Sequence, residues 1–392
     1  MVAPDPRSYA ALQLDKDREA TLDFPDLLPR KHTRMAESPL AYLRGAAPLF
    51  YALLADHPEL AEGPDGTGWL VGDAHLENFG AFRTAHADEA VAFDVNDFDE
   101  AVIGPFRFDV LRLLTAAILG GRELGSNGAA SLALCQALLD GYVSVLGSGV
   151  APTNRPPAVQ RLLDKVATRS HRDLLDRRTE LRGSTRRFSR GDRYRDLDPA
   201  MVPKAEAAFA SYVARLDPER KLDRSHFAVE DVAFRVAGVG SLGTLRIAIL
   251  ARGKGQPDSR WIFDMKREGV PAAQALVPVQ PENPAERVFA ANTACLQSPP
   301  RMMGITELDG QPLFVRRLLP QEDKLDLTHL KAAELPDLAR YLGGLLGMAH
   351  HRGARQLPAA PWTDAERTGL VQRAIVIAGV HEASYLSMCH TL

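Results

Sequence analysis

The sequence predicts a two-lobed α+β protein, and three observations support this fold class. The chain has 392 residues, which exceeds the length of about 150 residues expected for one domain. Apolar residues recur at helical spacing in the first half and again in LARYLGGLLGMAHH near the end. After about residue 225 the segments FAVEDVAFRVAGVG, TLRIAIL and RWIFDMK are alternating or β-branched, which is typical of an antiparallel sheet.

The composition is that of a soluble globular protein without a strong charge imbalance. Hydrophobic residues make up 45%, charged residues 25%, and the formal net charge is −3. These values exclude a disordered or collagen-like chain, and they provide no basic field for nucleic acid, which we therefore do not expect as a partner. Three separate cysteines without a CxxC pair indicate a reducing compartment. No apolar leader or stretch of about 18 apolar residues is visible, so we expect a cytoplasmic protein and no membrane span.

The elements of the first half follow from their boundary residues. Ser38 and Pro39 have the types preferred at a helix N-cap and first turn. The apolar runs at 68–72 and 91–95 predict two strands. Helices are expected over about 106–119, where Gly120-Gly121 is the predicted stop, and over about 128–146.

Four regions follow from these elements. We expect a polar N-terminal lead-in at 1–37 and a helical lobe at 38–224. An antiparallel sheet lobe should cover 225–320, and C-terminal helices at 321–392 should join the helical lobe. An insert at 165–195 carries eleven Lys and Arg against four Asp and Glu; it is expected to form a solvated face, with docking of an anion as the alternative.

Two predicted strands are each followed by a group of acidic and amide side chains. Paired strand ends of this kind suit a hard divalent cation bound through oxygen, with a general base beside it. The alternative is a set of turn carboxylates that cap nearby helices. The residues are Asp73, His75, Glu77 and Asn78 after the first strand, and Asp94, Asp97, Asp99 and Glu100 after the second.

Three chemistries compete for this acidic group. A metallophosphoesterase fits Asp73-Ala74-His75, but its downstream G-D-x-x-D and G-N-H motifs are absent. A zinc hydrolase needs more clustered histidines than His75 supplies. Phosphotransfer fits best, because it uses an Asp that accepts a hydroxyl proton, an Asn that binds Mg²⁺, and a further Asp on the same metal.

The motif GDAHLENFG at 72–80 resembles the catalytic loop of aminoglycoside-phosphotransferase-type kinases, and NDFDEAVIGPFRFD at 96–109 resembles their metal-binding segment. By that resemblance Asp73 is the catalytic base, Asn78 and Asp97 are metal ligands, and Asp109 is a structural carboxylate. The sequence departs from the pattern at Val71, which replaces the first histidine of the motif, and at Asp99, which replaces a glycine.

A second motif, G-x-G-x-x-G, lies between two predicted strands of the sheet lobe. A dinucleotide-binding loop would open a helix, whereas this loop is followed by the strand-like TLRIAIL. A strand–glycine loop–strand hairpin is typical of the phosphate cover of kinases, and a plain glycine hairpin is the alternative. The candidate phosphate-binding residues are Gly238, Gly240, Ser241 and Gly243.

Lys266 ends the strand WIFDMK and occupies the place of the kinase lysine that reaches the α- and β-phosphates. An ordinary edge-strand lysine is the alternative. Glu286, on the following helix, is the candidate ion-pair partner of this lysine. The pattern Asn283-Pro284-Ala285-Glu286 is equally typical of a capping box, so both roles stay open.

Together these motifs resemble the bacterial family called domain of unknown function 2252, over most of residues 35–355. The resemblance implies a protein-kinase-like fold in which the catalytic and metal loops precede the glycine loop and lysine, as in a circular permutation. It implies ATP and Mg²⁺ as cofactors and phosphoryl transfer from the nucleotide to a hydroxyl. A nucleotide-binding regulator without turnover, similar to a pseudokinase, is the alternative. The sequence leaves the acceptor and the oligomeric state open.

Overall fold

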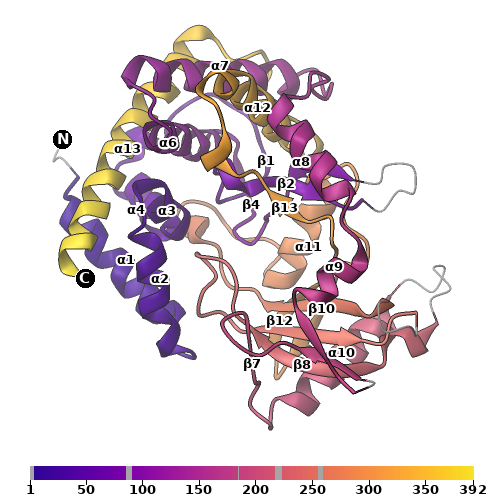
Figure 1. Ribbon diagram of the computed structural model, residues 1–392. Coiled ribbons are helices and arrows are strands. Elements are labelled where there is room, and N and C mark those ends of the chain that lie inside the picture. The colour runs from indigo at the N-terminus through magenta and orange to yellow at the C-terminus, as the bar shows by residue number, and fades with distance from the viewer. Residues whose placement is uncertain (1–3, 85–90, 184, 217–222, 255–258) are drawn as a thin grey trace.

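The predicted α+β class is confirmed in the computed structural model, which describes residues 4–84, 91–183, 185–216, 223–254 and 259–392. A layer of helices packs around short strands at one end of the molecule, and a larger sheet forms the other end (Figure 1). The first half of the chain and its last helices lie together in the helical part, although hundreds of residues separate them.

The large sheet has six antiparallel strands in the order β11-β12-β10-β9-β8-β7. Its core is rich in aromatic side chains, with Phe209 of α10 packed on Phe263 of β10 at 5.0 Å between ring centroids. α10 covers one face of the sheet and α11 lies between the sheet and the helical part. The elements are β7 (Tyr194–Arg195), α10 (Val202–Arg215), β8 (Val229–Arg235), β9 (Arg246–Ala251), β10 (Trp261–Arg267), α11 (Pro284–Cys295), β11 (Gly304–Leu308) and β12 (Gln311–Leu318).

The helical part is held together by one apolar core. The helix predicted to begin at Ser38 and Pro39 does begin there, since the Ser38 hydroxyl accepts a hydrogen bond from Ala41 N at 3.1 Å. The helix expected to stop at Gly120-Gly121 instead continues to Glu123, and Gly120 lies inside it where a Cβ would meet Leu76 at 2.9 Å and Leu40 at 3.1 Å. The helices are α3 (Pro39–Gly45), α4 (Ala47–Asp56), α5 (Pro58–Ala61), α6 (Arg107–Glu123), α7 (Gly128–Leu146), α8 (Pro157–Ala167), α12 (Leu335–Arg352) and α13 (Asp364–Thr391).

α7 is the one helix among the described residues that is long and apolar enough to cross a membrane by length and composition. It packs along α12 and against α6. Its buried residues, including Leu138 and Tyr142, belong to the apolar core. Packing in the core therefore accounts for its apolar composition.

Two small antiparallel sheets lie under these helices and carry the loops that follow the predicted strands. The first pairs β14 with β1 and β1 with β4, and the second pairs β13 with β2 and β2 with β3. The strands are β1 (Thr67–Leu70), β2 (Phe79–Phe82), β3 (Ala92–Val95), β4 (Val102–Pro105), β13 (Asp323–Lys324) and β14 (Ala354–Gln356).

The N-terminal region is more ordered than the expected polar lead-in. It forms α1 (Pro6–Ala20) and α2 (Leu28–Met35). α1 packs against α13 and α4. The buried face of α1 includes the polar Gln13 and Asp17, so its sequence lacks the apolar stripe by which such a helix is recognised.

The arginine-rich insert also has structure beyond a solvated face. It forms α9 (His171–Asp176) and the hairpin of β5 (Thr179–Arg182) with β6 (Thr185–Phe188), which lies against β8. Arg177 and Arg182 are exposed as expected, whereas Arg186 is buried. The insert therefore covers part of the large sheet.

Candidate functional site

Two loops that connect the small sheets lie in contact and carry the acidic side chains. The first loop joins β1 to β2, and the second joins β3 to β4. Gly72 has a φ of +83°, and a Cβ on it would lie 1.9 Å from the carbonyl oxygen of Glu100. Glycine is therefore required at this position for the two loops to approach so closely.

Asp73 is held by an arginine that the sequence did not single out. Arg112 Nε donates to Asp73 Oδ1 at 2.5 Å, and the Arg112 side chain is fully buried. Burial raises the pKa of Asp73 to about 7, although Arg112 opposes that shift. A carboxyl group with such a pKa can accept and release a proton near neutral pH.

Asp109 fixes the backbone that precedes Asp73, as a structural carboxylate should. Its two oxygens accept hydrogen bonds from Val71 N at 2.6 Å and Gly72 N at 2.9 Å. His350, at the end of α12, lies 3.0 Å from the same carboxylate. Because Asp109 and Arg112 are three residues apart on α6, both face the loop from one side of that helix.

Asn78 and Asp97 come from the two different loops and line the same cavity as Asp73. Asn78 Nδ2 donates to the carbonyl oxygen of Asp73 at 2.5 Å. Asp97 Oδ1 accepts a longer hydrogen bond from Asp99 N at 3.4 Å. Burial and the neighbouring Asp99 carboxylate raise the pKa of Asp97, which is the environment that a divalent cation would stabilise.

Among the described residues, no group of three or more His, Cys, Asp or Glu side chains forms a ready-made metal cage. Magnesium sites in proteins commonly use one or two carboxylates together with water and substrate phosphates. Asn78 and Asp97 supply oxygen ligands of the right type. They therefore fit a cation that the substrate helps to bind.

Residues 236–245 connect the antiparallel neighbours β8 and β9 and contain the glycine motif. Gly238, Gly240 and Ser241 line the cavity above Asp73. Gly243 does not, because it packs against the end of α1: a Cβ there would meet Thr21 Cγ2 at 2.5 Å. The last glycine is thus required by helix packing rather than by a cavity.

α2 contacts the glycine loop from outside. Lys31 Nζ donates to the carbonyl oxygen of Gly240 at 3.2 Å, and Arg34 donates to that of Gly238. Lys31 also pairs with the buried Asp17 of α1 at 2.9 Å. The N-terminal helices therefore hold the loop and line the cavity, a role that no sequence pattern indicated.

Lys266 lies in the same cavity but has different partners from the one predicted. Its Nζ pairs with Asp99 and lies 3.2 Å from Glu268 Oε2. Burial alone would lower the pKa of Lys266, but the two carboxylates raise it. Burial would likewise raise the pKa of Asp99, yet Lys266 lowers it to about 2.

Glu286 is not brought to Lys266 in the described structure. It is exposed in the first turn of α11, where its backbone N–H donates to the N-cap side chain of Asn283 at 3.2 Å. Arg287, one residue on, faces inward and donates to the carbonyl oxygens of Asp99 and Gly269 at 2.9 Å each. A shift of one residue turns a helical side chain by about 100°, and this decides which of the two is buried.

Two signals could have found the partners of Lys266. Glu268 lies two residues further along β10, and alternate residues of a strand share a face. Asp99 is the carboxylate that stands where the resembling motif has glycine. Asp99, which departs from the motif, thus forms the ion pair with Lys266 that Glu286 does not form.

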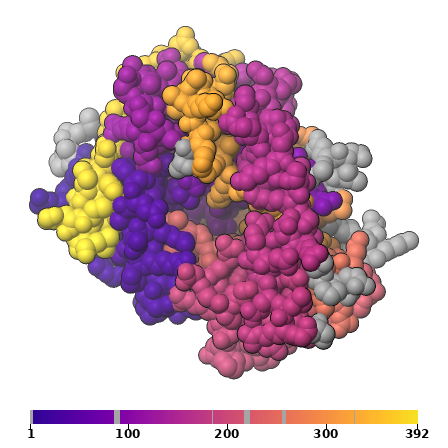
Figure 2. All heavy atoms as spheres, viewed as in Figure 1, coloured from indigo at the N-terminus to yellow at the C-terminus, as the bar shows by residue number. Residues whose placement is uncertain are grey.

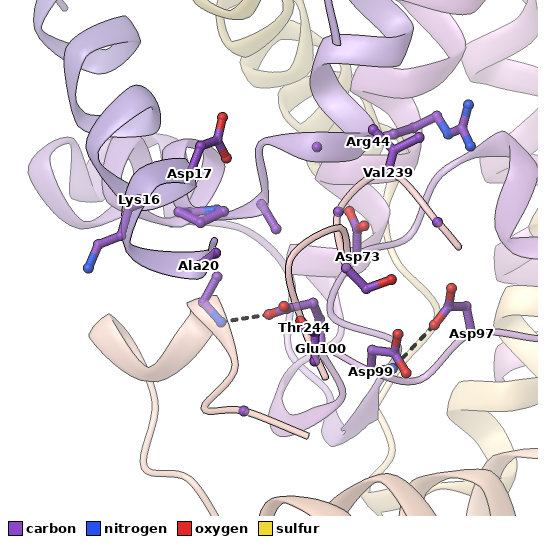
Figure 3. A pocket seen from close by; sticks show the side chains of 18 of the residues that line it. Lys16, Asp17, Ala20, Arg44, Asp73, Asp97, Asp99, Glu100, Val239 and Thr244 are labelled. Atoms are coloured by element: carbon purple, nitrogen blue, oxygen red, sulfur yellow. Dashed lines mark hydrogen bonds between the residues drawn. The ribbon is translucent and has the colours of Figure 1, made fainter. Parts of the chain in front are cut away.

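All these groups line one cavity of about 710 Å³, which we call the main cleft: Asp73, Asn78, Asp97, the glycine loop and Lys266 lie around it together with α1. Figure 2 shows a hollow between the N-terminal helices and the residues of the insert. In Figure 3 the carboxylates of Asp73, Asp97, Asp99 and Glu100 gather below Val239 of the glycine loop. Residues from Leu12 to Lys324 therefore meet at one place.

Comparison with protein families matches residues 23–383 to the family described as "Uncharacterized protein conserved in bacteria (DUF2252)". Comparisons with curated proteins and with solved structures found no match.

Proposed function

The chain belongs to the DUF2252 family, and from the geometry of its main cleft we propose that it is an ATP- and Mg²⁺-dependent phosphotransferase with a permuted kinase-like fold. The observation that carries the proposal is the meeting of Asp73, Asn78, Asp97, the glycine loop and Lys266 around one cavity. These are the parts that phosphoryl transfer requires, contributed in the reverse of the usual kinase order.

Each residue has a task in the proposed reaction. Asp73 accepts the proton of the acceptor hydroxyl, since burial brings its pKa to about 7. Arg112 holds the Asp73 carboxylate in one orientation. Asn78 and Asp97 hold Mg²⁺, which would neutralise charge on the phosphates of the nucleotide.

The glycine loop on one side of the main cleft supports the proposed binding of phosphate groups. A Cβ on Gly240 would have one neighbour within 4 Å, the carbonyl oxygen of Arg44 at 3.4 Å. The backbone at this position is thus open to close approach by a ligand, as in glycine-rich phosphate loops. Lys266 supplies the positive charge at the same edge of the cavity.

One observation favours a second candidate, a nucleotide-binding regulator without turnover. Lys266 already forms an ion pair with Asp99, and its Nζ lies 3.2 Å from Glu268, so Asp99 largely neutralises its charge. In a working phosphotransferase Asp99 must release the lysine when the nucleotide binds. Free cysteines, of which Cys135 and Cys295 are buried, suit a cytoplasmic location for either function.

Calorimetry with ATP tests the nucleotide and metal assignment. We expect ATP to bind in the presence of Mg²⁺ and to bind at least about tenfold more weakly after Asp97→Ala, because a charged ligand group is lost. Asp337→Ala, which removes an exposed carboxylate on α12, is the control and should bind as the wild type does. ATP binding that is unchanged both by removal of Mg²⁺ and by Asp97→Ala would contradict the metal assignment.

A further inference from the structure

A second cavity of about 310 Å³ lies beside the main cleft, under the large sheet. The two cavities share Asp97, Asp99 and Lys266. Four arginines line the second one: Arg178 from the insert, Arg235 of β8, Arg246 of β9 and Arg316 of β12. We call it the arginine chamber.

The sheet register explains why these arginines gather. Asp264 and Lys266 are two residues apart on β10 and therefore face the same side. Arg246 stands opposite Lys266, and Arg316 stands opposite Asp264. The sheet face that lines the chamber therefore carries charged residues on adjacent strands.

Among the described residues that line the chamber, six are basic and five are acidic: Arg178, Arg235, Arg246, Arg316, Lys266 and Lys324 against Asp97, Asp99, Asp264, Glu322 and Asp323. Asp264, which is 1% exposed, is contacted by Arg235 at 2.5 Å, by Arg246 at 2.8 Å and by Arg316 at 3.8 Å. Asp264 therefore contacts three guanidinium groups, and Arg316 also lies 3.6 Å from Glu322. Nη1 of Arg235 faces the Asp264 carboxylate, whereas among the described residues its Nε is buried without a hydrogen-bond acceptor, an arrangement that costs free energy unless a ligand supplies one.

The insert closes the outer side of the chamber. Arg169 donates to the carbonyl oxygen of Glu322 at 3.2 Å, and Gln321 Nε2 donates to that of Arg169 at 2.9 Å. Arg178 follows α9 and donates to the Tyr194 hydroxyl at 3.1 Å, which aligns it along the chamber wall. The chamber is therefore a partly enclosed, arginine-lined space beside the cluster of acidic residues.

We propose that the arginine chamber is a binding site for an oxyanion, such as a phosphate group of a substrate. Guanidinium groups bind phosphate oxygens through paired, charge-assisted hydrogen bonds. An oxyanion would supply the acceptor that Arg235 Nε lacks. Binding of an oxyanion there needs no Mg²⁺, so it can be tested separately from the proposed reaction, although its link to the nucleotide or the acceptor rests on the proposed function.

Inorganic pyrophosphate is the probe, titrated calorimetrically into the full chain in buffer with a chelator in place of Mg²⁺. We expect the wild type to bind it, and Arg178→Gln to weaken binding about tenfold or more because one charged donor is lost. Arg177→Gln is the matched control, since Arg177 is the exposed neighbour in the same insert, and it should bind as the wild type does. Arg235→Gln should weaken binding as well, but it disturbs the buried Asp264, so Arg178→Gln decides.

Two results would overturn the proposal: no pyrophosphate binding by the wild type at millimolar concentration, or binding that Arg178→Gln leaves unchanged. A titration of Arg178→Gln with ATP and Mg²⁺ then distinguishes the source of the oxyanion. Weakened ATP binding assigns it to the nucleotide, and unchanged ATP binding assigns it to the acceptor. Loss of ATP binding by Asp97→Ala with retained pyrophosphate binding would separate this site from the metal site.

Discussion

Asp73 sets the pH range in which the proposed reaction can run. Its carboxylate must be deprotonated to accept the hydroxyl proton, and burial raises its pKa to about 7. We therefore expect kcat/KM to rise with pH up to about 7 and then to level off. A flat profile between pH 5.5 and 8.5, measured with transfer rate-limiting, would contradict the assignment.

Asp73→Asn should lower transfer by about 10²–10⁴-fold while ATP still binds. The reason is that the amide keeps the size of the side chain but cannot take the proton. Glu77→Gln is the matched control: Glu77 belongs to the same loop but pairs with Arg44 at 2.8 Å. Full turnover by the Asp73→Asn protein would leave Asp73 a purely structural residue.

Glu268 should make the protein less stable as the pH rises. Burial and the neighbouring Asp99 raise its pKa to about 8, whereas the unfolded chain titrates near an ordinary glutamate value of about 4.3. Between these values the folded state holds a proton that the unfolded state has lost, so this stabilising contribution disappears as pH rises towards 8. Glu268→Gln should remove that decline, and equal slopes of the denaturation midpoint against pH for both proteins would count against it.

The predicted site residues that share the main cleft come largely from local motifs. Asp73 and Asn78 belong to one loop, and Asp97 follows the next strand, so short chain segments bring them together. Arg112 and Glu286 depend on helix phase instead. Arg287 rather than Glu286 faces inward because α11 packs against the loop that joins β3 to β4. No sequence pattern indicated this.

At the scale of elements, the glycine loop is shaped by two different requirements. Gly243 has a φ of +96° and touches α1, whereas Gly240 has an ordinary backbone and open space. We expect Gly243→Ala to destabilise the fold by about 1 kcal/mol or more. Gly240→Ala should unfold as the wild type does but bind ATP more weakly, because a methyl group intrudes where phosphate should lie.

Thermal unfolding and ATP calorimetry on both glycine variants check this separation. Each variant serves as the control of the other, since they differ by three positions in one loop. The reverse pattern, a destabilised Gly240→Ala and a neutral Gly243→Ala, would show that the loop is held differently.

The N-terminal helices could not be predicted, although they support this loop. A helix is recognised from sequence by an apolar stripe, and α1 buries Gln13 and Asp17 on its inner face. Asp17 is satisfied by Lys31 of α2, a contact between two helices that becomes visible only in three dimensions. The same limit applies to the insert, in which Arg177 is exposed, Arg186 is buried and Arg178 lines the arginine chamber.

For the molecule as a whole, the α+β class could be predicted because period-2 and period-3.6 patterns alternate clearly along the chain. The relative placement of the two halves could not, since it rests on long-range contacts such as that of Lys266 with Asp99. The permuted kinase-like arrangement remains our proposal. It follows from which residues share the main cleft, not from chain order.

Detection of phosphate transfer from γ-labelled ATP, to the protein itself or to a pool of metabolites, tests the central claim most directly. We expect the wild type with Mg²⁺ to transfer label, and Asp73→Asn, Asp97→Ala and a chelator each to stop it. Transfer that persists after Asp73→Asn and Asp97→Ala would contradict the assigned site. Mg²⁺-dependent ATP binding by the wild type without any transfer would contradict the phosphotransferase and support the regulator instead.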